Sequence, residues 1–415
     1  MASGADESSD AVHAFLEAAK GIAGPIANEN DRAVVLLKLY ELVNKVETPW
    51  DTFVRLYLTE PALVGVLKVL KDARIFERWP QNGTSPMTAA ELADLTDGFD
   101  PVLLRRLLRL LVANHLFELT SDGKYKLSGF CKRFTEPDFS TSAKFYEDCY
   151  IPVCHHMPAY FTETGYRNPS DVQRSAFGSA FGVEGGFFRY LEDNPRQGQV
   201  FNVSQRTWTS GQPRWTSIYP SAALLAGDDA PRRQQQRQQQ QPLLVDVGGS
   251  IGQDVQCFLE RHPGTASRVY LEDLPQVLED ENSTLARGVN RVPYDFFTPQ
   301  PIKHARAYYM HHILHDWPDK QARRILEMQR AAMKPGHSRI LIHDIVMSRD
   351  GSPCHPHAAV SDVTMMIFGS SKERTEDEWE ALVASAGLRI VKIWRAPAAK
   401  ESVIEVELAS ETPRL

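Results

Sequence analysis

Residues 244–252 read Leu-Val-Asp-Val-Gly-Gly-Ser-Ile-Gly, and the acidic pair Glu272-Asp273 follows at a distance of about twenty residues. The apolar residues predict a buried parallel strand. The glycines permit a sharp turn that brings the backbone close to a ligand before a helix begins at about Gln253. A second apolar run, Val269-Tyr270-Leu271, ends in the carboxylates. Because a carboxylate at the tip of the second strand can accept hydrogen bonds from both hydroxyls of a ribose, the pattern predicts a nucleoside site.

The size and charge of the chain limit the classes of protein it can belong to. Its 415 residues are too many for one ordinary domain, and the apolar fraction of 42% is sufficient for buried cores. The net charge of -7 argues against nucleic-acid binding as the main function, and no apolar run reaches the length of a membrane span. The five cysteines are scattered without CxxC spacing, so we expect no disulfide framework, no zinc site and a cytoplasmic location.

The first 135 residues predict an N-terminal helical domain. Helices are expected over 11–22 and 30–48, and the second is too apolar for a lone surface helix. We therefore expect it to pack against the body of the protein or against another subunit.

A compact helical pattern that ends in a hairpin spans residues 60–130. Thr88 and Glu91 form a capping box, and Asp100-Pro101 opens a strongly apolar helix. Apolar runs on both sides of Ser121-Asp122-Gly123 predict a β-hairpin. Together these features predict a winged-helix module, which serves either DNA binding or packing and dimerisation. The acidic balance favours the second role.

The middle of the chain divides into two segments. Residues 136–230 are expected to be helical, and their many aromatic side chains could form the wall of an apolar substrate pocket. Residues 231–242 form a glutamine-rich insertion of low complexity, to which we assign no function.

Strands and helices alternate over residues 243–415, which predicts a doubly wound, Rossmann-like α/β domain. A final antiparallel hairpin is expected at the edge of the sheet. The expected strands are 243–247, 268–272, 306–310, 339–343, 389–394 and 402–408, and the expected helices are 253–261, 275–280, 319–333 and 376–386.

The glycine turn alone does not distinguish an NAD site from an S-adenosylmethionine site, since domains that bind either cofactor use a strand, a glycine turn and a helix in this order. Residues 292–297 offer Asp295 as an acceptor for the exocyclic amine of an adenine and Phe296 as a surface for its ring. An ordinary loop with a buried aromatic side chain is the alternative interpretation.

Residues 308–317 read Tyr-Tyr-Met-His-His-Ile-Leu-His-Asp-Trp and leave a strand for a loop beside the expected cofactor edge. Histidine has the pKa best suited to proton abstraction near neutral pH, so His315 is a candidate general base. Three histidines in five positions also suggest a metal, but no carboxylate cluster lies at ligand spacing, and we predict no metal site.

These stretches together resemble the class I S-adenosylmethionine-dependent O-methyltransferases of the caffeic-acid type, in their fungal secondary-metabolite form. That family also carries an N-terminal dimerisation region with a winged-helix module, so the resemblance implies a homodimer. The matching stretches are Val245-Asp246-Val247-Gly248-Gly249, Leu271-Glu272-Asp273-Leu274-Pro275, Asp295-Phe296-Phe297, Ile313-Leu314-His315-Asp316-Trp317 and Ser371-Lys372-Glu373-Arg374-Thr375.

The resemblance implies a role for each matching residue. His315 would be the general base, with Asp344 and Glu373 orienting it. The other roles considered are a helix cap for Asp344 and a salt bridge for Glu373. Around the cofactor, Gly248 would approach the methionine part and Asp273 the ribose. The full set of cofactor candidates is Asp246, Gly248, Gly249, Gly252, Asp273, Leu274, Asp295, Phe296 and His311, where His311 stands at a position that usually carries Lys or Arg.

Candidates for substrate contact are fewer. The pair His155-His156 either faces the pocket or serves helix packing, and methionine suits a slot that must adapt to a flat phenol or enol. The remaining candidates are Met365, Met366 and Phe368.

Three functions are compatible with these residues. The first is methylation of a phenolic or enolic hydroxyl of a small aromatic or polyketide-type metabolite. The second keeps the fold and bound S-adenosylmethionine, as a structural or electrostatic cofactor, but catalyses a pericyclic or dehydration step. The third is a winged-helix regulator that senses a nucleoside. The intact set of His315, Asp344 and Glu373 favours methylation.

Overall fold

A computed structural model describes residues 3–22, 24–80, 84–226, 241–280, 285–349, 356–396 and 400–409. The chain divides into two compact units, Met1–Thr59 and Glu60–Leu415. Most of the glutamine-rich insertion and Cys354 lie outside the described residues. Within the described residues, every helix is too short or too polar to cross a membrane.

The first unit is helical, as the sequence predicts. It contains α1 (Ser3–Lys20), α2 (Glu29–Val46), α3 (Pro49–Val54) and the π-helical segment η1 (Arg55–Thr59). Thr48 caps α3, since its hydroxyl oxygen accepts a hydrogen bond from the backbone N of Asp51 at 3.2 Å. Many apolar side chains of α2 are exposed, which agrees with the expectation that this helix packs against another surface. They are Val34, Leu37, Leu39, Tyr40, Val43 and Val46.

The second unit begins with the predicted winged-helix pattern. Thr88 and Glu91 form the expected capping box, and the side chain of Asp100 accepts from the backbone N of Val102 at 2.7 Å. The elements are α4 (Glu60–Asp72), α5 (Ile75–Arg78), α7 (Ala89–Asp94), α8 (Pro101–Ala113), β1 (Phe117–Leu119), β2 (Tyr125–Leu127) and α9 (Gly129–Lys132). Strands β1 and β2 pair antiparallel, which confirms the hairpin.

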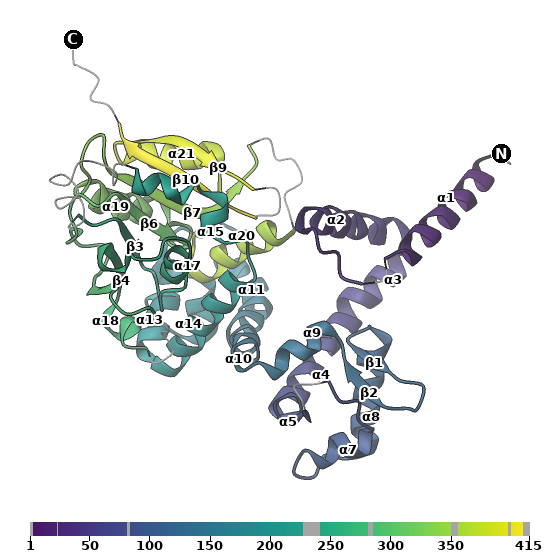
Figure 1. Cartoon of the computed structure of the whole chain (residues 1–415). Helices are drawn as coiled ribbons and strands as arrows, with labels where there is room; N and C mark the ends of the chain where they lie inside the picture. The colour runs from purple at the N-terminus through teal and green to yellow at the C-terminus, as the bar shows by residue number, and fades with distance from the viewer. Residues whose placement is uncertain are drawn as a thin grey trace. The chain divides into compact units, whose positions relative to one another are not determined.

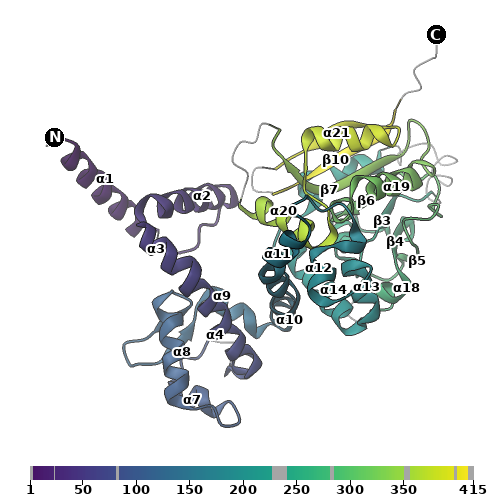
Figure 2. The ribbon, with the colours of Figure 1, turned by 180° about the vertical axis from the view of Figure 1, so that it is seen from behind.

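A helical segment follows, and helices α12, α13 and α14 lie beside one another in it (Figure 2). Its aromatic side chains form a common core in which Phe177 and Phe187 both contact Phe368, with ring centroids 5.1 and 4.9 Å apart. The helices are α10 (Pro137–Phe145), α11 (Ile151–Glu163), α12 (Ala176–Phe181), α13 (Gly186–Asp193), α14 (Pro195–Ser210) and α15 (Trp215–Ile218). Short 3₁₀ or π segments are η2 (Arg133–Thr135), η3 (Tyr146–Tyr150), η4 (Val172–Arg174) and η5 (Ser221–Leu225).

The C-terminal part contains the predicted sheet, with strand order β5-β4-β3-β6-β7-β10-β9 and β8 paired to β7 (Figure 1). The pairs among β3 to β7 are parallel, and β10 runs antiparallel to both β7 and β9. The strands are β3 (Leu244–Val247), β4 (Val269–Asp273), β5 (Asn290–Pro293), β6 (Ala307–His311), β7 (Arg339–Met347), β8 (Arg374–Thr375), β9 (Leu388–Trp394) and β10 (Glu401–Leu408).

Both faces of this sheet are covered, as a doubly wound domain requires. Val245 and Ile342 pack in one core with α19 and α21, whereas Leu244 and Leu341 pack in another with α15 and α17. Successive side chains of a strand point to opposite faces, which explains the division. The helices are α17 (Gln253–Arg261), α18 (Pro275–Leu278), α19 (Asp319–Arg330), α20 (Pro356–Gly369) and α21 (Glu376–Ser385), with short 3₁₀ segments η6 (Ala266–Arg268) and η7 (Leu314–Asp316).

Several details of the α/β domain differ from the sequence prediction. Helix α20 (Pro356–Gly369) and strand β8 (Arg374–Thr375) were not among the predicted elements. Residues 290–293 form strand β5, which was not among the predicted strands. Its residues alternate between half-buried and exposed and include Asn, Arg and Pro, so this edge strand lacks the apolar run of the central strands. Strand β7 also continues to Met347, beyond its predicted end at 343.

Candidate active site

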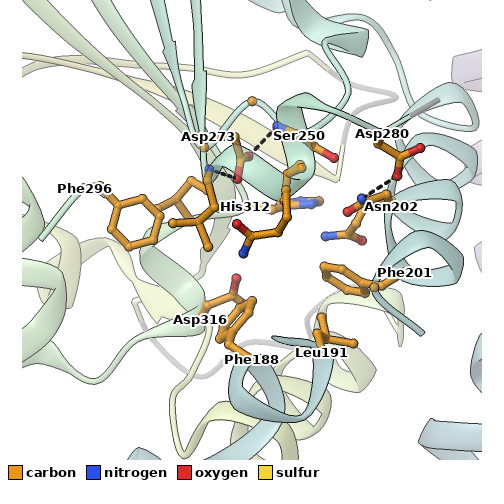
Figure 3. A pocket seen from close by; sticks show the side chains of 18 of the residues that line it. Phe188, Leu191, Phe201, Asn202, Ser250, Asp273, Asp280, Phe296, His312 and Asp316 are labelled. Atoms are coloured by element: carbon orange, nitrogen blue, oxygen red, sulfur yellow. Dashed lines mark hydrogen bonds between the residues drawn. The ribbon is translucent and has the colours of Figure 1, made fainter. Parts of the chain in front are cut away.

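The turn between β3 and α17 meets the tip of β4 at one end of a cavity. The backbone N of Ser250 donates to Oδ2 of Asp273 at 2.8 Å, and the backbone N of Leu274 donates to Oδ1 at 2.7 Å (Figure 3). Burial raises the pKa of Asp273 to about 6, although both backbone donors act in the opposite direction. The acid predicted to hold a ribose is therefore fixed in place by the glycine turn itself.

Glycine is required in this turn for two different reasons. Gly248 has a φ of +72°, in the left-handed region that favours glycine. At Gly249 an added Cβ would lie 2.5 Å from Oδ2 of Asp246. Gly248, Gly249 and Ser250 of this turn line the cavity.

The cavity has a volume of about 650 Å³. Most of the predicted cofactor residues line this cavity, and they come from the ends of several strands. They are Asp246, Gly248, Gly249, Asp273, Leu274, Asp295, Phe296 and His311. Gly252 is not part of the wall. It precedes α17, and a Cβ there would meet Leu285 at 2.7 Å.

Asp246 carries a carboxylate with unused hydrogen-bonding capacity. Its side chain is buried and lines the cavity, yet neither carboxylate oxygen has a hydrogen-bond partner among the described residues. Burial, followed by the nearby Asp254, raises its pKa well above the ordinary value. A ligand that brings a cationic or donor group to this carboxylate would remove the cost of leaving it unpaired.

Helices α13 and α14 supply the other wall. Figure 3 shows Phe188, Leu191 and Phe201 facing Asp273 and Phe296 across the cavity. This wall combines these apolar side chains with polar ones, among them Gln199, Asn202 and Gln205.

Contacts from both helices hold this wall to the rest of the site. The amide Nδ2 of Asn202 donates to Oδ2 of Asp280 at 2.8 Å (Figure 3). The ring of Phe188 stacks on Trp317, with centroids 5.4 Å apart.

The three predicted catalytic residues lie together, although they come from distant parts of the chain. His315 lies in η7, Asp344 in β7 and Glu373 just before β8. Nδ1 of His315 donates to Oε1 of Glu373 at 2.9 Å, and it lies 3.7 Å from Oδ1 of Asp344. Ser361 also donates to Oε1 of Glu373, at 2.7 Å. This pairing fixes the proton on Nδ1 and leaves Nε2 as the basic nitrogen of the neutral ring.

The three acids around His315 control its charge. Burial lowers the pKa of His315, but Glu373, Asp344 and Asp316 outweigh it and raise the pKa to about 10. Burial raises the pKa of Asp344 to about 7 and that of Asp316 to about 6. Burial acts in the same direction on Glu373, but His315 holds the pKa of that acid below its ordinary value. Near neutral pH this pKa keeps the imidazole of His315 protonated. A second cation close to the ring would lower the pKa and favour the neutral form.

His315 lies beside the cavity rather than in its wall. Its ring stacks on His312 with centroids 4.8 Å apart, and its Nε2 lies 3.6 Å from Oδ1 of Asp316. His312 and Asp316 both line the cavity. The proposed base is therefore separated from the cavity by a single layer of polar side chains.

The predicted substrate residues do not line this cavity. His155 is exposed, and Nε2 of His156 pairs with the hydroxyl of Ser179 at 2.9 Å. Met366 and Phe368 pack in the aromatic core of the helical segment, and Met365 is half-buried. The sequence pattern could not separate core positions of these helices from pocket positions.

Several polar residues near the cavity were not among the predicted candidates. Asp254, His312 and Asp316 line it, and Glu401 accepts from Nε2 of His312 at 3.1 Å. His312 and Asp316 lie close to His315 in the sequence, and Asp254 follows the glycine turn. Their positions beside predicted site residues could have identified them as candidates. Glu401 lies in β10, far along the chain from the predicted motifs, and no sequence feature marks it as a site residue.

Comparisons with known proteins place the chain in a family. An O-methyltransferase domain model matches residues 169–389, and an O-methyltransferase dimerisation domain model matches residues 59–137. The O-methyltransferase mfmE of Annulohypoxylon moriforme is 43% identical, over 93% of this chain and 93% of that protein. The chain belongs to the O-methyltransferase family. The O-methyltransferase asqD of Emericella nidulans is 32% identical over 81% of this chain and 84% of its own length.

Solved structures agree with this assignment. A protein described as a pericyclic reaction enzyme has a TM-score of 0.84 and 29% identity, over 96% of this chain and 100% of its own. LepI in complex with SAM has the same TM-score and identity, over 97% and 100%. OxaC in complex with SAH and oxaline has a TM-score of 0.79 and 26% identity, over 96% and 98%. The predicted fold and the predicted cofactor of the family, S-adenosylmethionine, are thereby confirmed.

Proposed function

We propose that this enzyme methylates a phenolic or enolic hydroxyl of a small aromatic or polyketide-type secondary metabolite, with His315 as general base. The observation that carries the proposal is the 2.9 Å hydrogen bond from Nδ1 of His315 to Glu373, directly beside the cavity of the glycine turn. The family assignment supplies the reaction class, and this pair supplies the proton acceptor.

The residues of the cavity fit S-adenosylmethionine. The unpaired carboxylate of Asp246 and the glycine turn at Gly248 and Gly249, which lines the cavity, suit the methionine end, which carries an ammonium group. Asp273 suits the ribose, while Asp295 and Phe296 suit the adenine. When bound, the cofactor supplies a methyl group activated by a sulfonium.

The chain's own task is to position the hydroxyl and to accept its proton. Because Glu373 holds the Nδ1 proton of His315, Nε2 is the atom that can take the proton of the substrate hydroxyl. The pKa of about 10 for His315 favours the charged form, but a cation bound nearby lowers the pKa of an imidazole. We therefore expect the base to become competent when the positively charged cofactor occupies the neighbouring cavity.

Substrate contacts are assigned to the wall made by α13 and α14. Phe188, Leu191 and Phe201 offer flat apolar surface, and Asn202 adds a polar group. A cavity of about 650 Å³ lies within the range of small-molecule sites, so the substrate is small. His155, His156, Met365, Met366 and Phe368 would then support the wall or the fold rather than touch the substrate.

A second candidate function is a pericyclic or dehydration step that uses bound S-adenosylmethionine without consuming it. The similarity to a pericyclic reaction enzyme over nearly the whole chain favours this candidate. The charged environment of His315, His312 and Asp316 would supply hydrogen-bond donors for such a step.

One experiment separates the two candidates. Purified enzyme is incubated with S-adenosylmethionine labelled in its methyl group and with a panel of phenols and enols. Methylation predicts label in the product and one S-adenosylhomocysteine per turnover, whereas product without S-adenosylhomocysteine supports the second candidate. His315→Ala should lower methyl transfer by about 100- to 10,000-fold and leave S-adenosylhomocysteine affinity nearly unchanged. His262→Ala removes another buried histidine, hydrogen-bonded to Ser221 at 2.8 Å, and serves as the control.

We also propose that the enzyme is a homodimer. The match to a dimerisation domain over residues 59–137 and the exposed apolar side chains of α2 support this state. Sedimentation at several protein concentrations tests it. The cytoplasmic location expected from the cysteines stays a prediction.

A further inference from the structure

A second, smaller cavity of about 230 Å³ shares Asp254 and His311 with the cofactor cavity. Its wall also contains His343 and Glu401, two buried polar side chains that the methyl-transfer mechanism does not use. Two imidazoles and a carboxylate thus meet beside the cofactor site.

Strand register explains why these three residues meet. His311 of β6 pairs directly with His343 of β7, and His343 pairs with Val403 of β10. Glu401 precedes Val403 by two positions, so it projects to the same face of the sheet. This is the face covered by α15 and α17, where Asp254 lies.

The potential ligand atoms have the spacing of a metal site. Oε2 of Glu401 lies 3.3 Å from Nε2 of His311 and 3.4 Å from Nε2 of His343. All three atoms lie within 4.8 Å of one another. Two ligands that are each about 2.1 Å from a tetrahedral ion are roughly 3.4 Å apart, which agrees with these separations.

The surrounding hydrogen bonds orient these atoms toward one another. Nδ1 of His311 donates to Oδ2 of Asp254 at 2.7 Å, and Nδ1 of His343 lies 2.8 Å from the Tyr309 hydroxyl. Metal-binding histidines commonly engage their second ring nitrogen in this way. Oε1 of Glu401 accepts from Trp208 at 3.4 Å and from His312 at 3.1 Å. Oε2 faces the cluster and accepts from Nε2 of His311 at 3.3 Å, a hydrogen bond that a bound ion would replace.

One of these ring nitrogens has no hydrogen-bond partner. His343 is 2% exposed, and its Nε2 makes no hydrogen bond with any described residue. It lies 3.4 Å from Oε2 of Glu401 without forming a hydrogen bond to it. A buried polar atom aimed at two potential ligands needs a further partner.

We propose that His311, His343 and Glu401 bind one divalent transition-metal ion of the Zn²⁺ class. Two imidazole nitrogens and one carboxylate oxygen suit Zn²⁺, whereas Mg²⁺ and Ca²⁺ prefer oxygen ligands throughout. The two carboxylates of Glu401 and Asp254 would balance the charge of the ion. The second cavity provides an entry path and room for a water as the fourth ligand. The ion would join β6, β7 and β10 beside the cofactor.

The test uses the untagged full-length enzyme, treated with EDTA and dialysed. Titration with ZnCl₂, followed by calorimetry, should show one ion per chain, and Co²⁺ should give the visible absorption of a tetrahedral site. His343→Asn and Glu401→Gln should each weaken Zn²⁺ binding by about 10-fold or more. His262→Ala should bind as the wild type does, because His262 contacts Ser221 and lies outside the cluster.

Each outcome decides the proposal. Substoichiometric Zn²⁺ binding, an octahedral Co²⁺ spectrum, or equal affinity in wild type, His343→Asn and Glu401→Gln would overturn it and indicate a hydrogen-bonded charge network only. Should His343→Asn fail to fold, the Co²⁺ spectrum of the wild type and the affinity of Glu401→Gln decide. None of these measurements depends on methyl transfer.

Discussion

His343 and Asp344 are consecutive residues of β7, but their side chains join two different polar clusters. Oδ1 of Asp344 lies 3.7 Å from Nδ1 of His315, whereas Nε2 of His343 lies 3.4 Å from Oε2 of Glu401. The alternation of side chains along a strand is the cause. The end of one strand therefore serves the proposed base on one face of the sheet and the proposed metal site on the other.

Asp344→Asn should shift the pH dependence of methyl transfer to lower pH. Asp344 is one of the acids that raise the pKa of His315 to about 10, and the base works only when it is deprotonated. Without this negative charge the pKa of His315 falls, so the rising limb of the pH profile of kcat/KM moves down. The profile measured with saturating cofactor checks this. An unchanged limb in the variant would show that Asp344 does not act on the ionisation of His315.

Glu373→Gln should lower turnover by roughly 10- to 100-fold, less than the loss expected from His315→Ala. An amide at this position still accepts from Nδ1 of His315, but it no longer stabilises the charge that the ring gains with the proton. Steady-state kinetics should show the loss in kcat with little change in KM for the cofactor. The matched control is Glu378→Gln, which replaces a half-buried acid that caps α21 and pairs with Lys372. A loss of equal size in the control would assign the effect to stability of the fold.

Gly249→Ala should weaken S-adenosylhomocysteine binding by about 10-fold or more. An added Cβ would lie 2.5 Å from the carboxylate of Asp246, the acid proposed to meet the methionine end. Displacing either group costs affinity, since a contact this short requires the backbone or the acid to move. Calorimetric titration measures the change. Gly129→Ala is the control, because nothing lies within 4 Å of its added Cβ, and it should bind as the wild type does.

The sequence predicted the central strands to within a few residues. Buried parallel strands are continuous apolar runs, and Leu244–Val247 and Ala307–His311 are bounded by a glycine turn and a polar loop that mark their ends. Strand β5 lacked this signal, because an edge strand with one exposed face needs no apolar run. Its identity depends on pairing with β4, which a single sequence does not display.

The sequence could predict only those parts of the candidate site whose residues lie in recognisable motifs. The contacts of His315 with Glu373 and Asp344 follow from three motifs at the ends of neighbouring strands. The meeting of His311 and His343 with Glu401 does not, because it depends on the register of β6, β7 and β10. The prediction of no metal site rests on spacing along the chain, whereas the proposed metal site depends on spacing across the sheet.

Glu272→Gln should stabilise the enzyme at alkaline pH but not at acidic pH. Burial raises the pKa of Glu272 from 4.5 to about 8, although its hydrogen bond from Gln300 acts in the opposite direction. An acid whose pKa is raised in the folded state binds more protons there, so the wild type loses stability as the pH rises from 4.5 toward 8. Each pKa unit corresponds to about 1.4 kcal/mol, and the full penalty is present above the folded pKa.

Glutamine at position 272 removes this penalty and keeps a carbonyl oxygen to accept from Nε2 of Gln300, which lies 2.7 Å from Oε2 of Glu272. Urea unfolding near the two ends of this pH range measures the difference between variant and wild type. The variant should match the wild type at the acidic end and exceed it by a few kcal/mol at the alkaline end. Glu118→Gln, at an exposed position of β1, should show no such pH-dependent gain. A constant difference between Glu272→Gln and wild type across the range would mean that Glu272 is already ionised in the folded enzyme throughout.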